Sequence, residues 1–465
     1  MQPQTPHRPL YWAEIIYDLQ NLLADTPELY LVGGTVRDAF RDVPFKDIDM
    51  AVAGDGRPIA RRIANAFSGD YYALDAEREV GRALLSLDGQ AYTVDVAAWR
   101  GPDLRTDLYD RDFTINAMAV PLASDLQAII DPLGGMRDWL DRILRCCTPQ
   151  SIAQDPIRAL RAVRLSLDFG LTMEPATRAD VAAAAEGLRA SSAERRRDAL
   201  FGILHTAKPV SGLALLRYLG LMPAALPDLA PLPDDAWRSL SQRLDKLNTL
   251  MAVISPRRDD NIAANAEFGT FVYLLDRYRR DWQAYLSTPY PDDRTGRELM
   301  LLAAALRDVA PSAKALTRDL ALSREESQHL NGVWQGAEFL QGLQGGPLPD
   351  PRTIYHFWHT YDDHGLGALL LTLADYLAER GLYLKMPDWT HYLQGVARIL
   401  AGWAPAREAS PVVNGEQLMA YFELEPGPLL GDLLGALREA NALGEVTTEA
   451  EAYALAEQLL ASLNG

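Results

Sequence analysis

The sequence predicts an α+β protein in which a small N-terminal domain with a mixed sheet is followed only by helices. Three observations predict this class. Short apolar segments that end in turn residues or alternate with polar residues, as strands do, occur only before residue 145. Beyond Pro149, apolar residues recur three and four positions apart, as in helices. A length of 465 residues with 48% hydrophobic content favours roughly two to four domains.

The strand signals of the N-terminal domain follow one another in a clear order. The first apolar segment ends at Gly33-Gly34, which predicts a strand that enters a tight turn. The segment Asp47-Ile48-Asp49-Met50 alternates acidic and apolar residues, the pattern of a half-buried strand. The pair Asp88-Gly89 predicts the turn of a hairpin. We therefore expect strands at 29–32, 47–52, 83–87 and 92–97, and helices at 36–40 and 57–67.

The remainder of the chain is expected to be helical. Helices are predicted at 155–169, 175–188, 192–205 and 210–219, with breaks at 227–233, 289–293, 345–351 and 404–411. We divide the chain into four segments and name them head (1–145), neck (146–222), body (223–390) and tail (391–465).

Charge and composition exclude several classes of protein. The formal net charge of −18 argues against a general nucleic-acid coat protein, although roughly two thirds of the acid excess lies after Met222, which leaves room for a locally basic groove. No apolar segment reaches the ~18 residues of a membrane span, and Met1–Pro9 lacks the apolar core of a signal peptide. The two cysteines are adjacent, Cys146 and Cys147, which favours a reducing compartment. A cytoplasmic protein is expected.

Asp47 and Asp49 are the strongest chemical signal. Side chains two apart on a strand share a face, so these carboxylates converge. Paired hard oxygen ligands suit Mg²⁺, which nucleotidyl transfer uses. Taken alone, an Asp-x-Asp would more often be a solvated edge strand. Here Gly33-Gly34 precedes it, a turn whose N–H groups can approach phosphate, and Arg37 follows one helical turn later. Asp95, on a later strand, is a candidate third catalytic carboxylate, with a structural acid as the alternative.

Five segments resemble the class II (bacterial-type) tRNA nucleotidyltransferases and their poly(A) polymerase relatives, in that family's order and with similar spacing. They are LVGGTVRD (31–38), DIDMAV (47–52), DRDFTINAM (110–118), DPLGGMRDWLDRILR (131–145) and QDPIRALRAVR (154–164), and weaker similarity continues to the C-terminus. The resemblance implies a polymerase-beta-like nucleotidyltransferase head that acts on tRNA with Mg²⁺.

The resemblance also implies a role for each matching residue. Asp47 and Asp49 match metal-binding catalytic carboxylates, and Gly33, Gly34 and Arg37 match a triphosphate-binding loop. The other matches are to ribose and phosphate contacts (Arg111, Asp112, Asn116), to a hinge (Asp131, Gly135, Asp138) and to the residues that read the base (Asp155, Arg158, Arg161).

Base reading by Asp155 and Arg158 has a physical logic of its own. Cytosine and adenine each present an amino donor beside a ring-nitrogen acceptor. An aspartate accepts from the amino group and an arginine donates to the ring nitrogen, whereas uracil and guanine have the opposite polarity. Three apart on a helix, the two side chains would share a face. The alternative is that Asp155 caps a helix that begins at Pro156, and both can hold.

Three departures from the family pattern bear on specificity. Asp110 stands where the family usually has arginine, and Gln154 where it usually has glutamate. Relatives that add the complete CCA sequence carry a flexible loop before the second motif, whereas here only Gly101–Tyr109 fills that interval. Members that add only two cytidines characteristically lack this loop, so the resemblance favours CC addition.

The body resembles the HD-type phosphohydrolase domain of long-form members, but Arg307-Asp308 replaces the His-Asp pair that binds metal. Arginine cannot ligate a metal ion, so hydrolase activity is not expected. His356, His359 and His364 are interpreted as packing or surface residues. The tail matches a region that grips the tRNA elbow in the family, with helix packing alone as the alternative. Arg195–Arg197 would be either an RNA contact or solvated surface.

We therefore expect a template-independent enzyme that adds cytidine to tRNA. The RNA 3′-hydroxyl would attack the α-phosphorus of CTP in line, with two metal ions held by Asp47 and Asp49. The alternatives within this chemistry are complete CCA addition from CTP and ATP, and poly(A) tailing. Those outside it are a non-catalytic RNA-binding scaffold and a metal-dependent phosphohydrolase.

Overall fold

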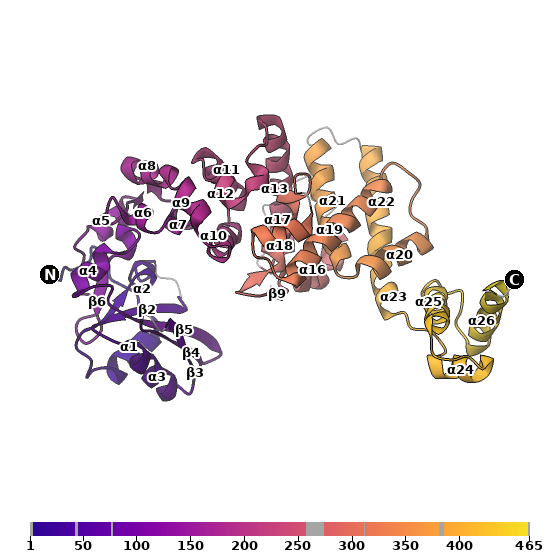
Figure 1. Ribbon diagram of the computed structural model, residues 1–465, viewed down its shortest axis with the longest axis horizontal. Coiled ribbons are helices and arrows are strands. Elements are labelled where there is room, and N and C mark those ends of the chain that lie inside the picture. Colours follow the sequence, from indigo (N-terminus) through magenta and orange to yellow (C-terminus); the bar gives the residue numbers. More distant parts are fainter. Residues whose placement is uncertain are drawn as a thin grey trace. The chain divides into compact units, whose positions relative to one another are not determined.

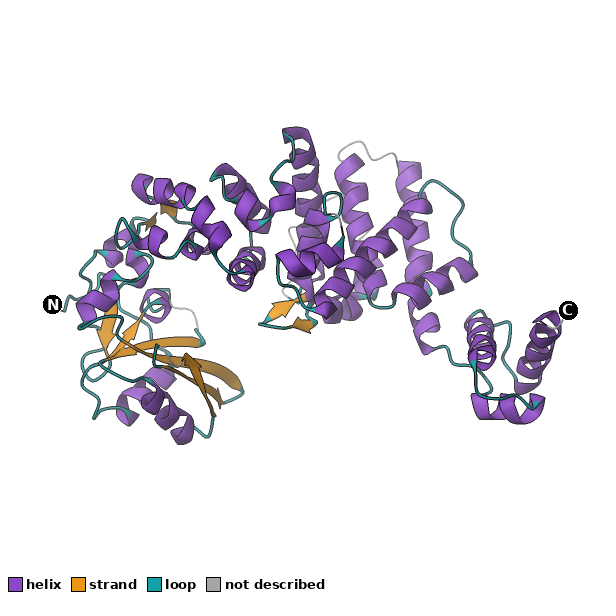
Figure 2. Ribbon diagram, in the orientation of Figure 1, coloured by secondary structure: helices purple, strands orange, loops and turns teal. Residues whose placement is uncertain are grey.

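The computed structural model describes residues 3–41, 45–75, 78–256, 274–310, 312–380 and 386–463. The chain forms two compact units, Met1–Pro227 and Asp228–Gly465 (Figure 1). Among the described residues, the first unit contains a six-stranded sheet, and the second is helical apart from a two-stranded hairpin (Figure 2). The α+β class expected from the sequence is confirmed. In the described ranges no helix combines the length and the apolar character that a membrane span requires.

The head sheet has the strand order β3-β4-β5-β2-β1-β6. Strand β2 runs parallel to β5, and all other neighbours are antiparallel. Asp88 and Gly89 form the expected turn between β4 and β5, and both have positive φ, 50° and 77°. The strands are β1 (Leu29–Val32), β2 (Asp47–Val52), β3 (Asp70–Asp75), β4 (Val80–Leu87), β5 (Gln90–Ala98) and β6 (Ala119–Pro121). Strands β3 and β6 were not expected from the sequence.

Two helices cover one face of this sheet, namely α1 (Glu14–Leu22) and α3 (Arg57–Ala66). Ile48 and Met50 of β2 are buried in the core that these helices close. Because strand side chains alternate, Asp47 and Asp49 point to the opposite face. The alternation expected for β2 therefore decides which side of the sheet carries the two carboxylates.

The rest of the first unit consists of short helices and one small parallel strand pair, β7 (Ile143–Leu144) with β8 (Thr172–Met173). The expectation that strands end before residue 149 is wrong for β8. The helix expected at 175–188 is two helices, because the chain turns at Ala184. The helices are α2 (Gly34–Asp38), α4 (Leu104–Tyr109), the 3₁₀ turn Thr114–Asn116, α5 (Gly135–Leu140), α6 (Ser151–Gln154), α7 (Ile157–Phe169), α8 (Pro175–Ala183), α9 (Ala185–Ala190), α10 (Ala193–His205), α11 (Pro209–Tyr218) and α12 (Met222–Ala225).

The second unit packs long helices around α21, and the break expected at 289–293 is the hairpin of β9 (Pro289–Tyr290) with β10 (Arg294–Thr295). The boundary expected at residue 390 lies inside α22, and α23 occupies much of the break expected at 404–411. The helices are α13 (Asp234–Ile254), α16 (Arg279–Leu286), α17 (Gly296–Leu306), α18 (Ala313–Asp319), α19 (Arg324–Gly342), α20 (Pro351–Tyr361), α21 (His364–Arg380), α22 (Met386–Ala401), α23 (Trp403–Glu408), α24 (Gly415–Phe422), α25 (Pro428–Ala442) and α26 (Glu449–Leu463).

Candidate nucleotide site

One cavity of about 1250 Å³ in the first unit brings the predicted site residues together. It lies between the open face of the head sheet and helices α6, α7 and α10, so strand and helix residues that are distant in sequence meet there. All the residues singled out for catalysis and nucleotide binding line it: Gly33, Gly34, Arg37, Asp47, Asp49, Asp95, Arg111, Asp112, Asn116, Asp155, Arg158 and Arg161.

The acidic wall of the cavity consists of three carboxylates on two parallel strands. Asp47 is exposed, and its carboxylate makes no hydrogen bond or ion pair with another side chain in the described ranges. Asp49 is half-buried, and burial raises the pKa of its carboxyl group. The charge of Arg111 opposes that shift, while Asp95 and Asp47 add to it. An additional cation at this point would therefore stabilise the charged form of Asp49.

Asp95 lies directly opposite Asp49 in the β2–β5 register, but its carboxylate is already engaged. Arg82 of β4 donates from Nε and from a terminal nitrogen to the two Asp95 oxygens, both at 2.8 Å. Nowhere in the described part of the chain do three or more His, Cys, Asp or Glu side chains form a metal-binding group by themselves. Asp47 and Asp49 nevertheless fit Mg²⁺, which commonly takes one or two carboxylates and completes its shell with substrate phosphates and water.

The glycine turn lies against the acidic strand. Gly33 has φ +65°, and a Cβ added there would be 3.0 Å from Asp49 Oδ2 and 3.1 Å from a terminal nitrogen of Arg111. The Gly34 N–H donates a hydrogen bond to the Asp49 carboxylate, and the Asp49 N–H donates to Thr35 Oγ at 2.6 Å. At position 33, only a glycine can adopt this backbone conformation and also leave room for the Asp49 and Arg111 side chains to approach so closely.

Arg37 is held in place from three sides. A terminal nitrogen donates to Asn116 Oδ1 at 2.7 Å, and Nε and the other terminal nitrogen donate to Asp38. The guanidinium also lies 4.4 Å from the centre of the Phe169 ring, at the end of α7. Arg37, which the sequence predicts to bind the triphosphate, therefore contacts both the second motif, through Asn116, and the neck, through Phe169.

Asp112 is buried, and protein donors occupy both of its carboxylate oxygens. Oδ1 accepts from the Phe113 N–H and from Asn116, and Oδ2 accepts from Arg161 at 2.8 and 2.9 Å. Burial alone would raise the pKa of Asp112, but Arg161 and the hydrogen bonds outweigh it and lower the pKa to about 2. Asp112 thus orients Arg161 and Asn116 toward the cavity, a role that the sequence motif did not reveal.

The expected base-reading residues, Asp155 and Arg158, do not lie on one helix as the sequence predicts. Asp155 has an extended backbone between α6 and α7, and its carboxylate accepts from Arg195 at 2.8 and 3.0 Å. It does not cap α7, so that alternative is wrong. Arg158 is buried, donates to the carbonyl oxygens of Asp110 and Ser151, and lies 4.0 Å from Asp155.

Sequence reasoning missed several arginines of the cavity. Arg78, Arg100 and Arg164 also line it, as does Arg195, which the sequence left open as either an RNA contact or solvated surface. Of the run Arg195–Arg197, only Arg195 reaches the cavity, whereas Arg196 bonds the Ala224 carbonyl and Arg197 is buried beside Asp198. Arg164 stands in the fifth motif at the helical spacing of Arg158 and Arg161, a signal that could have identified it. Arg78 and Arg100 lie at strand ends, where no periodicity marks them.

The departures from the family pattern have local consequences. The Asp110 carboxylate faces Arg100 at 3.4 Å, and Gln154 is exposed at the cavity. The short interval Gly101–Tyr109 is ordered as α4, which Asp103 caps by accepting from the Thr106 N–H at 2.8 Å. Leu104 and Leu108 bury α4 in a hydrophobic cluster beside the sheet, so this interval forms a packed helix.

The matched hinge motif is tightly bonded. Asp131 accepts from the N–H groups of Gly135 and Met136 at the start of α5, and Asp138 accepts from Thr114 and Arg145. A Cβ at Gly135 would lie 2.1 Å from the Thr114 carbonyl oxygen. This contact packs α5 directly on the second motif.

In the second unit, paired arginine and aspartate side chains lie where the resemblance to the HD-type domain implies a metal site. Arg307 pairs with Asp375, and Arg243 pairs with both Asp375 and Asp308. His356 is exposed beside Glu439, His359 stacks on Tyr355, and His364 lies against His329. Both carboxylates, Asp308 and Asp375, are thus paired with arginine side chains.

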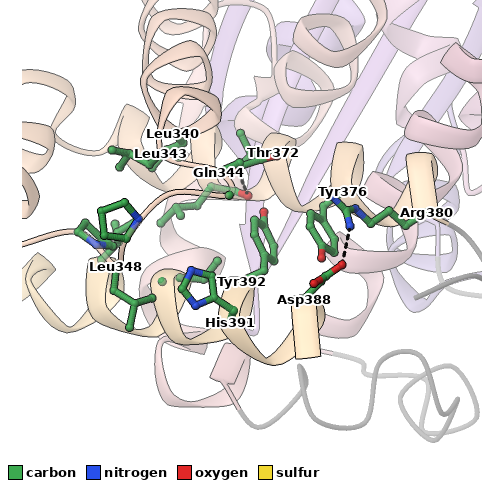
Figure 3. A pocket seen from close by; sticks show the side chains of 17 residues that line it. Leu340, Leu343, Gln344, Leu348, Thr372, Tyr376, Arg380, Asp388, His391 and Tyr392 are labelled. Atoms are coloured by element: carbon green, nitrogen blue, oxygen red, sulfur yellow. Dashed lines mark hydrogen bonds and ion pairs between the residues drawn. The ribbon is translucent and has the colours of Figure 1, made fainter. Parts of the chain in front are cut away.

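A second cavity, of about 330 Å³, lies between α19, α21 and α22 (Figure 3). Tyr376 and Tyr392 stack at 4.0 Å on one wall, and Arg380 pairs with Asp388 at 3.5 Å beside them. Apolar side chains line this cavity together with the Arg380–Asp388 ion pair. Its lining has no group of acids and arginines like the one that converges in the first cavity.

Comparison with known proteins gives consistent results. Residues 29–145 match the family described as the poly A polymerase head domain, and residues 170–232 match a probable RNA- and SrmB-binding site of polymerase A. The CC-adding tRNA nucleotidyltransferase of Geobacter sulfurreducens is 30% identical over 424 residues, which cover 91% of this chain and 90% of that protein. The A-adding tRNA nucleotidyltransferase of Deinococcus radiodurans is 30% identical over 444 residues, 93% and 95% of the two chains.

Solved structures share the fold. The Thermotoga maritima CCA-adding enzyme complexed with tRNA aligns over 100% of both chains with a TM-score of 0.63 at 21% identity. A CCA-adding enzyme in an apo form aligns with a TM-score of 0.64 at 22% identity, over 98% of this chain and 96% of that one.

Proposed function

The chain belongs to the class II tRNA nucleotidyltransferase and poly(A) polymerase family, and from this premise we propose that it adds two cytidines to the 3′ end of tRNA, using CTP. One observation carries the proposal. Paired strand carboxylates, a phosphate-approaching glycine turn and the Asp155–Arg158 pair all line a single cavity. A scaffold that only binds RNA has no need for this combination.

Each group has a part in the transfer. The Gly33-Gly34 turn and Arg37 bind the triphosphate, and Asp47 and Asp49 hold Mg²⁺. Mg²⁺ held there would lower the pKa of the attacking hydroxyl and would offset the charge of the leaving pyrophosphate. The RNA 3′-hydroxyl loses its proton to water, and its oxygen forms a new bond to the α-phosphorus of CTP. The bond from that phosphorus to the oxygen that bridges the α- and β-phosphates breaks, and pyrophosphate leaves. Asp95, beside Asp49, is proposed as the third carboxylate.

Base choice rests on Asp155, Arg158 and Arg161. Asp155 accepts from the cytosine amino group and Arg158 donates to the ring nitrogen, while Arg161, held by Asp112, supports the same wall. Adenine offers the same polarity, so this pair alone does not separate CTP from ATP. The packed helix α4 stands in the interval that carries the flexible loop in related enzymes that add all of CCA. This supports CC addition, with complete CCA addition as the second candidate.

The carboxylates provide the first test. Asp47→Ala and Asp49→Ala should each lower CMP incorporation by about 10³-fold or more, because positioning and charge neutralisation supply nearly all of this catalysis. Asp18→Ala is the matched control, an exposed acid on α1 at the opposite face of the sheet. Substantial incorporation by a correctly folded Asp49→Ala protein would refute the assignment.

The nucleotide is tested with tRNA that lacks its 3′ end and with each NTP separately. CTP alone should extend the RNA by two residues, and ATP should then add nothing. A terminal adenosine after the cytidines would identify a CCA-adding enzyme, and long ATP tails a poly(A) polymerase. If no NTP is incorporated, the chain is not the proposed enzyme, and the alternative of a non-catalytic RNA-binding scaffold remains.

A further inference from the structure

The catalytic carboxylates belong to a row of side chains that crosses the open face of the sheet. The strand registers pair Asp49 with Asp95, Asp95 with Arg82, and Arg82 with Tyr72. Cross-strand partners point to the same face, so Tyr72 on the edge strand β3 shares the face of Asp49 on β2. Three strand spacings separate them, which is about 14 Å.

A second row runs beside the first. Asp47 pairs with Thr93, Thr93 with Leu84, and Leu84 with Asp70. Tyr72 is 51% exposed and Leu84 is 37% exposed. Their neighbours of opposite orientation, such as Ala83 and Val94, are fully buried beneath α1 and α3. The open face therefore continues from the acids to the exposed side chains of Tyr72 on β3 and Leu84 on β4. Figure 1 shows β3 and β4 beside β5 and β2 in the head sheet.

The geometry of in-line attack indicates which part of the substrate approaches over Tyr72 and Leu84. The Gly33-Gly34 turn lies at the end of β1, on one side of Asp49, and is proposed to hold the triphosphate. The attacking oxygen must approach the α-phosphorus from the side opposite the leaving pyrophosphate. In the strand order β1-β2-β5-β4-β3, that side is β5 and then β4 and β3. The neck wall of the cavity is already assigned to the incoming base.

We propose that Tyr72 and Leu84 form a platform on which the unpaired 3′-terminal nucleotides of the RNA substrate stack before transfer, and this rests on the proposed function. Stacking on aromatic side chains accepts any base, which suits an end whose sequence changes with each addition. Arg78, which is exposed and lines the cavity near β4, is placed to meet a backbone phosphate. The platform lies about three to four stacked nucleotides from the carboxylates at ~3.4 Å each.

Steady-state kinetics on tRNA that lacks its last nucleotides test the platform. Tyr72→Ala and Leu84→Ser together should raise KM for the RNA roughly tenfold, the loss of about one stacked base, and leave KM for CTP unchanged. Tyr72→Phe keeps the ring and should behave as the wild type. Tyr17→Ala is the matched control, because Tyr17 is 49% exposed on α1, which packs on the opposite face.

A direct contact is tested by near-ultraviolet cross-linking of an RNA whose unpaired 3′ end carries 4-thiouridine about three positions before the terminal nucleotide, the separation of the platform from the carboxylates. The cross-link should map to 70–87 and disappear in the double variant. If the wild type adds cytidine while the double variant matches Tyr17→Ala, the platform is wrong and the proposed function stands. If the wild type adds nothing, the proposed function itself fails. A sedimentation change in the double variant would make the patch a contact between two copies of the chain, which overturns the proposal.

Discussion

Arg195 extends from α10 to Asp155, which we propose reads the base, and holds its carboxylate with one terminal nitrogen. The pair is solvent-exposed, so it adds little to stability. Its effect should instead be on orientation. Arg195→Ala should raise KM for CTP several-fold and reduce the preference for CTP over UTP by about tenfold, because Asp155 is no longer held toward the amino group.

The control for this change is Arg196→Ala, the neighbouring arginine whose guanidinium bonds the Ala224 carbonyl and stays out of the cavity. Competition between CTP and UTP in one reaction measures the preference directly. An unchanged CTP-to-UTP ratio in Arg195→Ala would mean that Asp155 is positioned without it.

His329 makes stability depend on pH. It is buried in the second unit, where the hydroxyl groups of Tyr285 and Tyr290 bond its two ring nitrogens at 3.2 and 2.9 Å. Burial, reinforced by the charge of His364, lowers its pKa to about 3. The unfolded chain therefore binds a proton below about pH 6.5 while the folded chain does not, and stability falls as pH drops. Between pH 7 and 5 the loss should be about 2 kcal/mol.

Urea denaturation at both pH values measures this loss, and His329→Gln, which does not titrate, should show a correspondingly smaller difference. The same pH dependence in the variant and the wild type would place the titrating group elsewhere.

At the scale of elements, one buried acid links three helices of the second unit. Asp375 of α21 is paired with Arg243 of α13 and with Arg307, which follows α17. Removing it leaves two largely buried guanidinium groups without their shared partner. Asp375→Ala should therefore cost about 3–5 kcal/mol of unfolding free energy.

Asp308→Ala is the matched control, because Asp308 pairs with the same Arg243 at 2.6 Å but its side chain is 60% exposed. It should cost less than about 1 kcal/mol. Equal losses in the two variants, measured by urea denaturation, would contradict a structural role specific to Asp375.

At the scale of the whole molecule, the C-terminal helices form a core of their own. Val413, Leu418, Leu433 and Leu437 belong to a separate hydrophobic cluster that closes within α24–α26. Ion pairs from Arg352 to Glu439 and Glu445 also join this segment to α20. We propose that it binds tRNA. A chain that ends at residue 411 should keep KM for CTP and raise KM for tRNA at least about tenfold, through lost hydrogen bonds and packing against the RNA, because Arg438 is the only Lys or Arg in the removed segment.

Calorimetry should show that the shortened chain still unfolds cooperatively, because the removed segment has a hydrophobic cluster of its own. KM for CTP should be kept because the cavity lies entirely in the first unit. An unchanged KM for tRNA would limit the tail to a packing role.

The sequence by itself determined what depends on short-range geometry. Strand alternation is a local property, so the shared face of Asp47 and Asp49 followed from their spacing, as did the turn at Asp88-Gly89. The motif residues were identified without the structure because their order along the chain is itself the signal. The α+β class followed from the change of apolar period near Pro149.

Only the tertiary structure decided which partners these residues have. The bonds from Arg161 to Asp112 and from Arg195 to Asp155 join segments whose separation no local pattern encodes. The edge strand β3 was missed because its residues are mostly exposed on both sides, which removes the alternation that marks a strand. The physical reason is the same throughout. Backbone geometry repeats over two to four residues, whereas the meeting of distant side chains depends on how the whole chain packs.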